Sequence, residues 1–355
     1  MLYSLIGKGI NMKRNLRLLI LLILTLVFSC NLKSQTSNST DTTNLWPEIE
    51  PFHTAYLNVS DVHEIYYELC GNPKGKPVFV IHGGPGGQCT PYYRRFFNPA
   101  KFLIVLFDQR GSGKSKPLGE LRQNSTQDLI EDIEELRIHL NLDKIVLFGG
   151  SWGSTLCLAY AEKYPNKMSG MVLRGVFTAT EKEMDHIHYQ IPKFFPVEYD
   201  NYVSALPEPN KVPTPDYLFS SITKSDDNTA KQLLQAWLNY ESKTNMLEAP
   251  ANLLEEILSS SSQEGILAAL KVQQHYVINQ FFLEDGQILR NVNRISHIPI
   301  ILINGRYDMY CPPEIAYRLH KMLPKSELII VERAGHWMGE EPIEKELIKA
   351  MENFE

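Results

Sequence analysis

Six short apolar runs limit the fold of this chain more than any other feature of its sequence. They are rich in Val, Ile and Leu and lack polar alternation, so they predict strands buried on both faces. The runs cover 78–81, 103–107, 145–148, 171–173, 300–303 and 328–331. Two upstream segments, 56–59 and 64–69, alternate better and predict antiparallel strands at the sheet edge. The sequence therefore predicts an α/β fold with a mostly parallel sheet flanked by helices.

The pattern of strands stops between residues 178 and 293. This stretch contains seven prolines and no strong strand signal, and it carries helical segments at 231–240, 253–258 and 266–282. Because strand signals resume at 300, we interpret 178–293 as a helical cap inserted into a core formed by 46–177 and 294–355. A ligand is expected to bind between the cap and the sheet.

The first thirty residues have the character of an export signal. Three basic residues between 13 and 17 precede an apolar run, 18–28, that is short for a membrane span. The run ends in Val-Phe-Ser-Cys, which resembles a bacterial lipobox with Cys30 as the lipidated residue. A plain cleaved signal and an uncleaved anchor remain alternatives, and Met12 competes with Met1 as the start. Residues 31–45 are polar and predict a flexible linker, so we expect an exported lipoprotein at a bacterial membrane facing the periplasm.

Composition limits the class of partner. The net charge of −6, without a basic cluster beyond the N-terminus, argues against nucleic-acid binding and favours a small-molecule or peptide substrate. The oligomeric state does not follow from the sequence. No metal-binding spacing is present, and free buried thiols are the default expectation for the four remaining cysteines, Cys70, Cys89, Cys157 and Cys311.

The segment Gly149-Gly150-Ser151-Trp152-Gly153 matches Gly-x-Ser-x-Gly. It follows a predicted strand and precedes a predicted helix, which is the context of a nucleophile elbow. A serine on such a turn is strained, and flanking glycines avoid collisions with the neighbouring strand and helix. Ser151 is therefore the predicted nucleophile.

Two further residues complete a predicted catalytic triad. Asp308 follows the apolar run 300–303, and His336 follows the run 328–331. This order, Ser then Asp then His on loops after late strands, is that of the α/β-hydrolases. Asp308 is expected to fix the imidazole tautomer, and His336 is expected to accept the Ser151 proton.

An oxyanion hole needs two backbone donors. The Trp152 amide, next to the nucleophile, is one candidate. The second is expected from the glycine-rich segment 82–87, with Gly84 as the first choice and Gly83 as the alternative. The segment 108–115 lacks the first glycine of a nucleotide-binding loop, and we interpret it as a wall of the active site.

Together these residues resemble the proline iminopeptidases, serine aminopeptidases that remove an N-terminal proline. The resemblance covers nearly the whole chain after the N-terminal signal. It lies in the motifs His-Gly-Gly-Pro-Gly-Gly (82–87), Asp-Gln-Arg-Gly-Ser-Gly (108–113), Gly-Gly-Ser-Trp-Gly-Ser-Thr (149–155), Leu-Arg-Gly (173–175), Gly-Arg-Tyr-Asp (305–308) and Ala-Gly-His (334–336). The family's fold and triad then carry over to this chain, and the resemblance implies that no cofactor is needed.

The resemblance also implies substrate-binding residues. Glu241 is the candidate anchor for a protonated prolyl nitrogen, although a glutamate on a solvated helix face is the alternative. Gln273 occupies the position of a second family carboxylate, and a neutral amide cannot balance charge. Arg174, Phe177, Trp237 and Tyr240 complete the expected pocket. The expected partners are short peptides with a free N-terminus. Other amides or esters are the alternative substrates, and a non-catalytic peptide-binding lipoprotein is a third hypothesis.

Overall fold

The computed structural model describes residues 45–206, 208, 213–224, 227–249 and 262–355. The predicted signal, the linker up to residue 44, Cys30 and the helical segment 253–258 lie outside the described residues. The segment Asn44–Glu355 forms one compact unit. Among the described helices, none combines the length and apolar character that crossing a bilayer requires.

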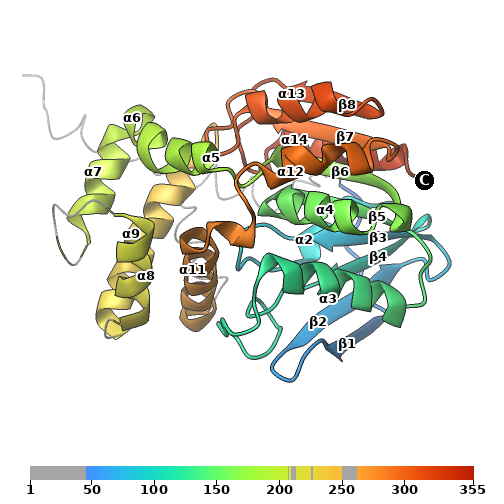
Figure 1. Ribbon diagram of the computed structural model, residues 1–355, viewed down its shortest axis with the longest axis horizontal. Helices are drawn as coiled ribbons and strands as arrows, with labels where there is room; N and C mark the ends of the chain where they lie inside the picture. Colours follow the sequence, from blue (N-terminus) through green and yellow to red (C-terminus); the bar gives the residue numbers. More distant parts are fainter. Residues whose placement is uncertain (1–44, 207, 209–212, 225–226, 250–261) are drawn as a thin grey trace, which may run out of the picture. The chain divides into compact units, whose positions relative to one another are not determined.

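An eight-stranded sheet forms the centre of the fold (Figure 1). Its strands lie in the order β1-β2-β4-β3-β5-β6-β7-β8. β1 and β2 pair antiparallel, as do β2 and β4, and the remaining neighbours are parallel. The predicted edge strands and buried parallel strands are thus confirmed. Their bounds are His53–Asn58, Glu64–Gly71, Lys76–Ile81, Phe102–Phe107, Ile145–Ser151, Met168–Val176, Ile300–Gly305 and Ser326–Val331 for β1 to β8.

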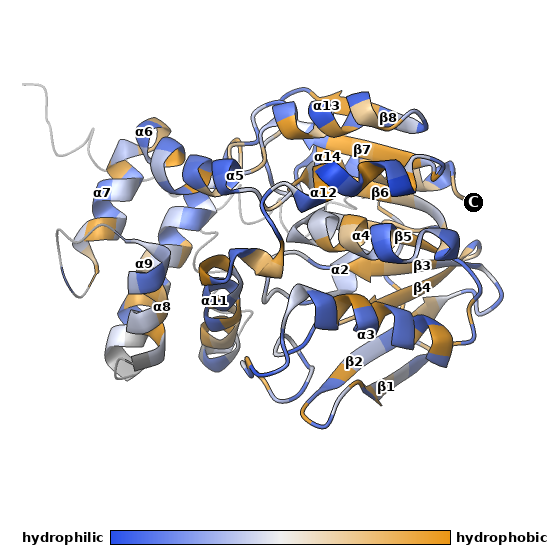
Figure 2. Ribbon diagram, viewed as in Figure 1, coloured by the Kyte–Doolittle hydropathy of each residue, from blue (hydrophilic) through white to orange (hydrophobic). Residues whose placement is uncertain are grey.

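Helices cover both faces of the sheet. Because successive side chains of a strand point to opposite faces, Phe79 and Ile81 pack on one side while Val78 and Val80 pack on the other. The first side holds α3 (Thr126–His139), α4 (Trp152–Lys163), α12 (Gln287–Asn291) and α13 (Pro313–Met322), and the second holds α2 (Pro91–Arg94) and α14 (Glu341–Glu352). Figure 2 shows hydrophobic strands β3, β4 and β7 between helices that carry hydrophilic residues.

Helix α3 begins where the sequence indicates. Ser125 is its N-cap, and the Ser125 hydroxyl and the Asp128 carboxylate each accept a hydrogen bond from the other residue's backbone amide. This capping box satisfies amides that have no partner within the helix. Its apolar residues, including Leu129, Ile133 and Leu136, are buried in the first core cluster.

The regular elements described between β6 and β7 are helices and helical turns. They include α5, a π-helical turn η2, α6, α7, α8, α9, α11 and the 3-10 turns η3 and η4. Their bounds are Glu181–Asp185, His186–Gln190, Ile191–Phe194, Pro196–Ser204, Pro215–Lys224, Asp227–Thr244, Gln263–Ile278, Gln280–Phe282 and Val292–Ile295; a further turn, η1, is Pro165–Lys167. An apolar cluster of their own, including Tyr202, Leu233 and Leu270, holds the cap helices together.

Both ends of the predicted core need adjustment. α12 and η4, within the predicted cap segment 178–293, contact α4 of the sheet domain, because Ile288 and Val292 are buried in the core cluster that contains α4. At the other end, Leu45 was predicted to be the last residue of the linker but is buried in the second core cluster.

The four described cysteines are free thiols, and Cys89 alone among them is half-buried.

Candidate active site

The nucleophile elbow forms at the end of β5. Ser151 has φ 56° and ψ −128°, a conformation that L-residues rarely adopt, and α4 begins at the next residue. A Cβ at Gly149 would lie 2.6 Å from the Cys157 Sγ, and one at Gly153 would collide with the Ile81 carbonyl oxygen. The turn therefore accepts only glycine at these two positions, and it presents Ser151 at the carboxyl edge of the sheet.

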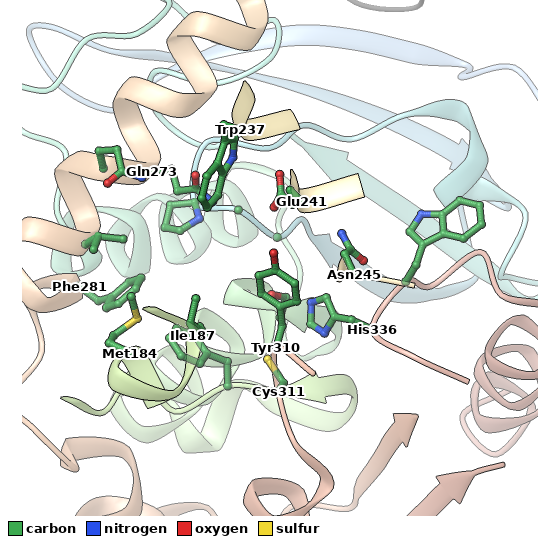
Figure 3. Close-up of a pocket in the computed structure, with 18 of the residues that line it drawn as sticks. Met184, Ile187, Trp237, Glu241, Asn245, Gln273, Phe281, Tyr310, Cys311 and His336 are labelled. Carbon is green, nitrogen blue, oxygen red and sulfur yellow. The ribbon is translucent and has the colours of Figure 1, made fainter. Parts of the chain in front are cut away.

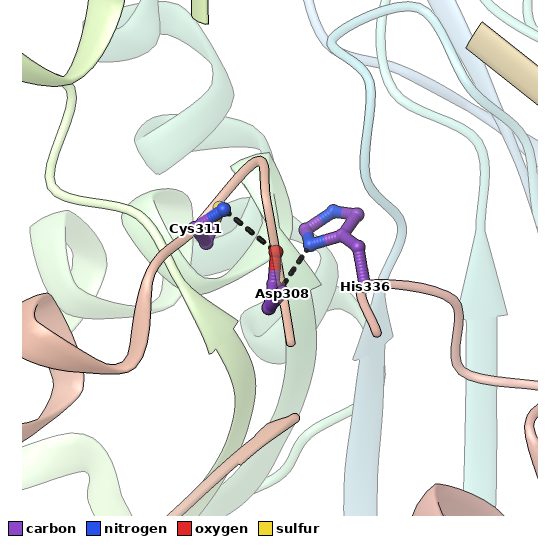
Figure 4. Close-up of side chains that lie close together, drawn as sticks. All are labelled: Asp308, Cys311 and His336. Carbon is purple, nitrogen blue, oxygen red and sulfur yellow. Dashed lines mark hydrogen bonds and ion pairs between the residues drawn. The ribbon is translucent and has the colours of Figure 1, made fainter. Parts of the chain in front are cut away.

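Asp308 and His336 lie side by side on the loops after β7 and β8 (Figure 4). The Asp308 Oδ2 is 2.8 Å from the His336 Nδ1, and the Asp308 Oδ1 accepts a hydrogen bond of 2.7 Å from the Cys311 amide. Both side chains are buried. With both carboxylate oxygens engaged, the Asp308 side chain has a fixed orientation and directs the imidazole Nε2 away from itself.

The Ser151 hydroxyl interacts with the Cys311 thiol in this structure. No hydrogen bond between Ser151 and His336 is formed in the described chain, although both line one pocket. The His336 Nε2 lies 3.4 Å from Arg174 Nη1, and the same guanidinium nitrogen donates to the His336 carbonyl oxygen. Catalytic hydrogen bonds are commonly loose in enzymes without substrate.

The predicted oxyanion donors lie next to Ser151 in the chain or line the pocket with it. Trp152 is the first residue of α4, where backbone amides lack partners within the helix. The Gly84 amide donates to no acceptor among the described residues, and Gly84 has φ +121°. Gly83 and Gly84 both line the pocket with Ser151, so the structure keeps both candidates for the second donor.

A pocket of about 230 Å³ lies between the strand ends and the cap. Figure 3 shows Trp237 and Glu241 from α9 on one side of it, opposite Tyr310 and His336 from the sheet domain. The predicted residues Arg174, Phe177 and Gln273 also line it.

Tyr240 differs from the prediction, because it is buried inside the cap. Its ring stacks on Tyr202 with centroids 5.3 Å apart. On α9, Trp237 and Glu241 are four residues apart and share one face, whereas Tyr240 belongs to the face that packs against α7.

Comparison with known proteins agrees with this geometry. The model of the alpha/beta hydrolase fold family matches residues 76–342. A probable proline iminopeptidase of Leptolyngbya boryana is 43% identical over 312 residues, which cover 87% of this chain and 96% of that protein. This chain belongs to the proline iminopeptidase family.

Further members of the family include a proline iminopeptidase of Xylella fastidiosa, 40% identical over 87% of this chain and 99% of that protein. Solved structures show the same fold at lower identity. A proline iminopeptidase-related protein from Thermus thermophilus has a TM-score of 0.56 at 19% identity, covering 86% of this chain and 98% of its own. A 2-hydroxy-6-oxo-6-phenylhexa-2,4-dienoate hydrolase from Rhodococcus has a TM-score of 0.58 at 18% identity. The match covers 85% of this chain and 98% of that chain.

Glu241 is the one carboxylate among the described residues that line this proline iminopeptidase pocket. Burial raises the pKa of Glu241 to about 7, and a hydrogen bond with the Trp237 side chain acts in the opposite direction. Burial thus favours the protonated form of this carboxyl group. A bound ammonium group would restore its negative charge, since an opposite charge favours the ionised form.

Several pocket residues carry no signal in the sequence. Phe281 lies in the turn η3, where three consecutive residues have positive φ. Its ring stacks on Trp152 at 5.6 Å and meets Phe177 edge-on at 5.2 Å. Tyr310 lies 5.6 Å from the His336 ring, and its hydroxyl bonds to Thr244 of the cap. The one sequence signal that could have indicated Tyr310 as a pocket residue is its position two residues after Asp308.

The triad region also contains a group of possible metal ligands. One ligand atom each from Asp308, Cys311 and His336 lies within 4.8 Å of the others. The Asp308 carboxylate already bonds to the His336 ring and the Cys311 amide. A metal ion here would compete with the hydrogen bond that orients the imidazole, so the arrangement fits a triad better than a metal centre.

The segment 108–115 differs from its predicted role as an active-site wall. None of its residues, all of them described, lines the pocket. Instead, the Asp108 carboxylate accepts hydrogen bonds from the Cys89 and Lys114 amides, at 2.7 and 2.8 Å. The segment therefore lies behind the glycine-rich loop and supports it.

Proposed function

We propose that this protein is a serine aminopeptidase that releases N-terminal proline, or another small residue, from peptides with a free N-terminus. The observation that carries the proposal is the single carboxylate of Glu241 in the same pocket as Ser151 and His336. A pocket with one buried carboxylate favours a cationic group over a neutral one. The relatives that are named proline iminopeptidases support the same substrate class.

The chemistry follows from the order of the groups. His336 accepts the Ser151 proton while Ser151 Oγ bonds to the scissile carbonyl carbon, and the resulting oxyanion is held by the Trp152 and Gly84 amides. The C–N bond then breaks as His336 gives its proton to the leaving amine. Water attacks the prolyl ester on Ser151 by the same route, with His336 again as base, and free proline leaves.

Glu241→Gln is expected to lower kcat/KM for a prolyl arylamide by about 10²-fold, because a charged hydrogen bond to the substrate ammonium is lost. The acid limb of the pH profile should also change. The ionised form of Glu241 prevails above pH about 7 and is lost as the pH falls. Protonation of Glu241 should therefore lower wild-type kcat/KM as the pH falls, and this part of the pH dependence should be absent from the variant. Initial rates from pH 5 to 9 measure both effects.

Two variants and one substrate serve as controls. N-acetylprolyl arylamide has no ammonium group, so the ratio of free to blocked turnover should fall in Glu241→Gln. Glu264 is an exposed cap glutamate, and Glu264→Gln should leave that ratio unchanged. Gln273→Glu adds a second carboxylate beside the first and should raise the ratio.

A second candidate function is hydrolysis of other amides or esters on the same scaffold. The Gln273 side chain that lines the pocket is neutral and favours this function, because Glu241 is then the one carboxylate among the described lining residues that can bind a substrate ammonium group. Cleavage of N-blocked amides or simple esters as fast as the prolyl arylamide, with no dependence on Glu241, would replace the aminopeptidase proposal by this one.

The proposed location is the periplasmic side of a bacterial membrane, with acylated Cys30 as the first residue of the processed protein. The charged start, the short apolar run and the polar linker support it. Cys30→Ala is expected to move the enzyme from the membrane fraction to the soluble fraction, and mass spectrometry of the wild-type N-terminus should find the acyl groups. A soluble wild-type enzyme that begins at another, unmodified residue would contradict the proposal.

A further inference from the structure

Gln109 lies at the centre of a buried hydrogen-bond network that joins the two halves of the proposed oxyanion hole. Its side chain is 1% exposed. The Trp152 indole Nε1 donates to Gln109 Oε1 at 2.9 Å, and Gln109 Nε2 donates to the His82 carbonyl oxygen at 2.9 Å. An indole can only donate and a carbonyl can only accept, so the orientation of the Gln109 amide is fixed.

The same residue fixes the tautomer of His82. The Gln109 backbone amide donates to His82 Nε2 at 3.0 Å, so this nitrogen is the acceptor. Burial lowers the pKa of His82 to about 4, and the ring is therefore neutral with its proton on Nδ1. His82 Nδ1 lies 2.9 Å from the Gly83 carbonyl oxygen and donates to it. Gln109 Nε2 also lies 3.2 Å from His82 Nδ1, and because both nitrogens are donors, the Gln109 amide donates to the His82 carbonyl oxygen instead.

This hydrogen bond determines where the Gly84 amide points. In a trans peptide, the C=O of one residue and the N–H of the next point in opposite directions. The Gly83 carbonyl is held by His82 Nδ1 and, at 3.3 Å, by the Gly87 amide. The Gly84 N–H is therefore directed to the other side of the peptide plane. It has no acceptor among the described residues, and Gly84 lines the pocket that contains Ser151.

We propose that Gln109 is a positioning residue that holds both amide donors of the oxyanion hole, Trp152 through its indole ring and Gly84 through His82. It touches neither substrate nor triad, because it does not line the pocket. The adjacent Asp108 accepts a hydrogen bond from the Cys89 amide, two residues after the glycine-rich segment 82–87. The inference rests on the serine hydrolase chemistry proposed above.

Oxyanion donors act in the transition state and contribute little to ground-state binding. Gln109→Met keeps the side-chain volume and removes the side-chain bonds to the Trp152 indole and the His82 carbonyl oxygen, while the backbone bond to His82 Nε2 remains. The variant is expected to lower kcat about 10- to 100-fold and to change KM by less than about threefold. An effect of this size follows when oxyanion donors are displaced by a fraction of an ångström. The inhibition constant of prolinal, the aldehyde that forms a tetrahedral adduct with Ser151, should rise by the same factor as kcat/KM falls. The inhibition constant of proline should not change.

Two further variants keep the test decisive. Trp152→Phe retains the backbone amide but loses the indole donor to Gln109, so kcat and prolinal binding should both fall, by less than in Gln109→Met. This variant tests the proposal even if Gln109→Met does not fold. Tyr160 lies on α4, like Trp152, but does not line the pocket, and Tyr160→Phe removes its buried hydrogen bond to Glu134 of α3. It should lower thermal stability while leaving the prolinal constant unchanged.

A fall in kcat without weaker prolinal binding would overturn the proposal, and so would a parallel loss of proline affinity. Failure of the aminopeptidase proposal is a separate result. In that case phenylboronic acid, which adds to Ser151 and carries no amine, replaces prolinal, and the comparison uses the arylamide or ester that the enzyme does cleave.

Discussion

Ser151→Ala is expected to lower kcat by about 10⁶-fold while the protein stays folded, because the variant loses the one oxygen that attacks the substrate. Alanine has the same Cβ as serine, so the positive φ at this position is strained equally in both proteins. Among the described residues, the side-chain interaction that this variant loses is that with the Cys311 thiol. Release of arylamine from a prolyl arylamide measures the activity, and thermal unfolding measures the stability.

Covalent labelling separates a silent protein from a catalytic one. A fluorophosphonate should modify Ser151 in the wild type, as a mass shift on one peptide, and should modify nothing in Ser151→Ala. Ser220 lies in the cap and does not line the pocket, and its hydroxyl donates to the Tyr217 carbonyl oxygen, so Ser220→Ala should retain both labelling and turnover. Wild-type activity in Ser151→Ala would end the triad assignment. An unlabelled wild type would support the hypothesis of a non-catalytic peptide-binding lipoprotein.

Asp308→Asn is expected to lower kcat by about 10⁴-fold, the effect of placing the histidine in the wrong tautomer. The Cys311 amide needs an acceptor and so selects the oxygen of the new side chain. The amide nitrogen then faces His336 Nδ1, which must accept a hydrogen bond instead of donating one. The proton moves to Nε2, and the imidazole can no longer accept the Ser151 proton.

The matched control changes a buried acid to its amide outside the site. Glu162 lies on α4 with one carboxylate oxygen unpaired, and burial raises its pKa to about 8, so it is already protonated near pH 7. Glu162→Gln should therefore leave kcat and KM unchanged. If Asp308→Asn retained activity within tenfold of the wild type, the role of Asp308 in orienting His336 would be excluded.

Local sequence patterns were sufficient for the core of the fold and for the elements that carry the triad. Strands buried on both faces require continuous apolar runs, and the glycines around Ser151 are required by contacts with Ile81 and Cys157. The start of α3 follows from Ser125 and Asp128, whose capping bonds form between residues three apart. Each of these features has a recognisable local sequence pattern, so the sequence alone indicates it.

The composition of the pocket was decided by tertiary packing. Helix α9 offers Trp237, Tyr240 and Glu241 at nearly adjacent positions, and only its contact with α7 determines that Tyr240 turns into the cap while the other two face Ser151. Phe281 reaches the site through a turn with positive φ that no motif marks. Gln109 gains its role from Trp152 and His82, each more than twenty-five residues away along the chain. Sequence periodicity indicates that a residue is buried, but the partner against which it is buried depends on how separate elements meet.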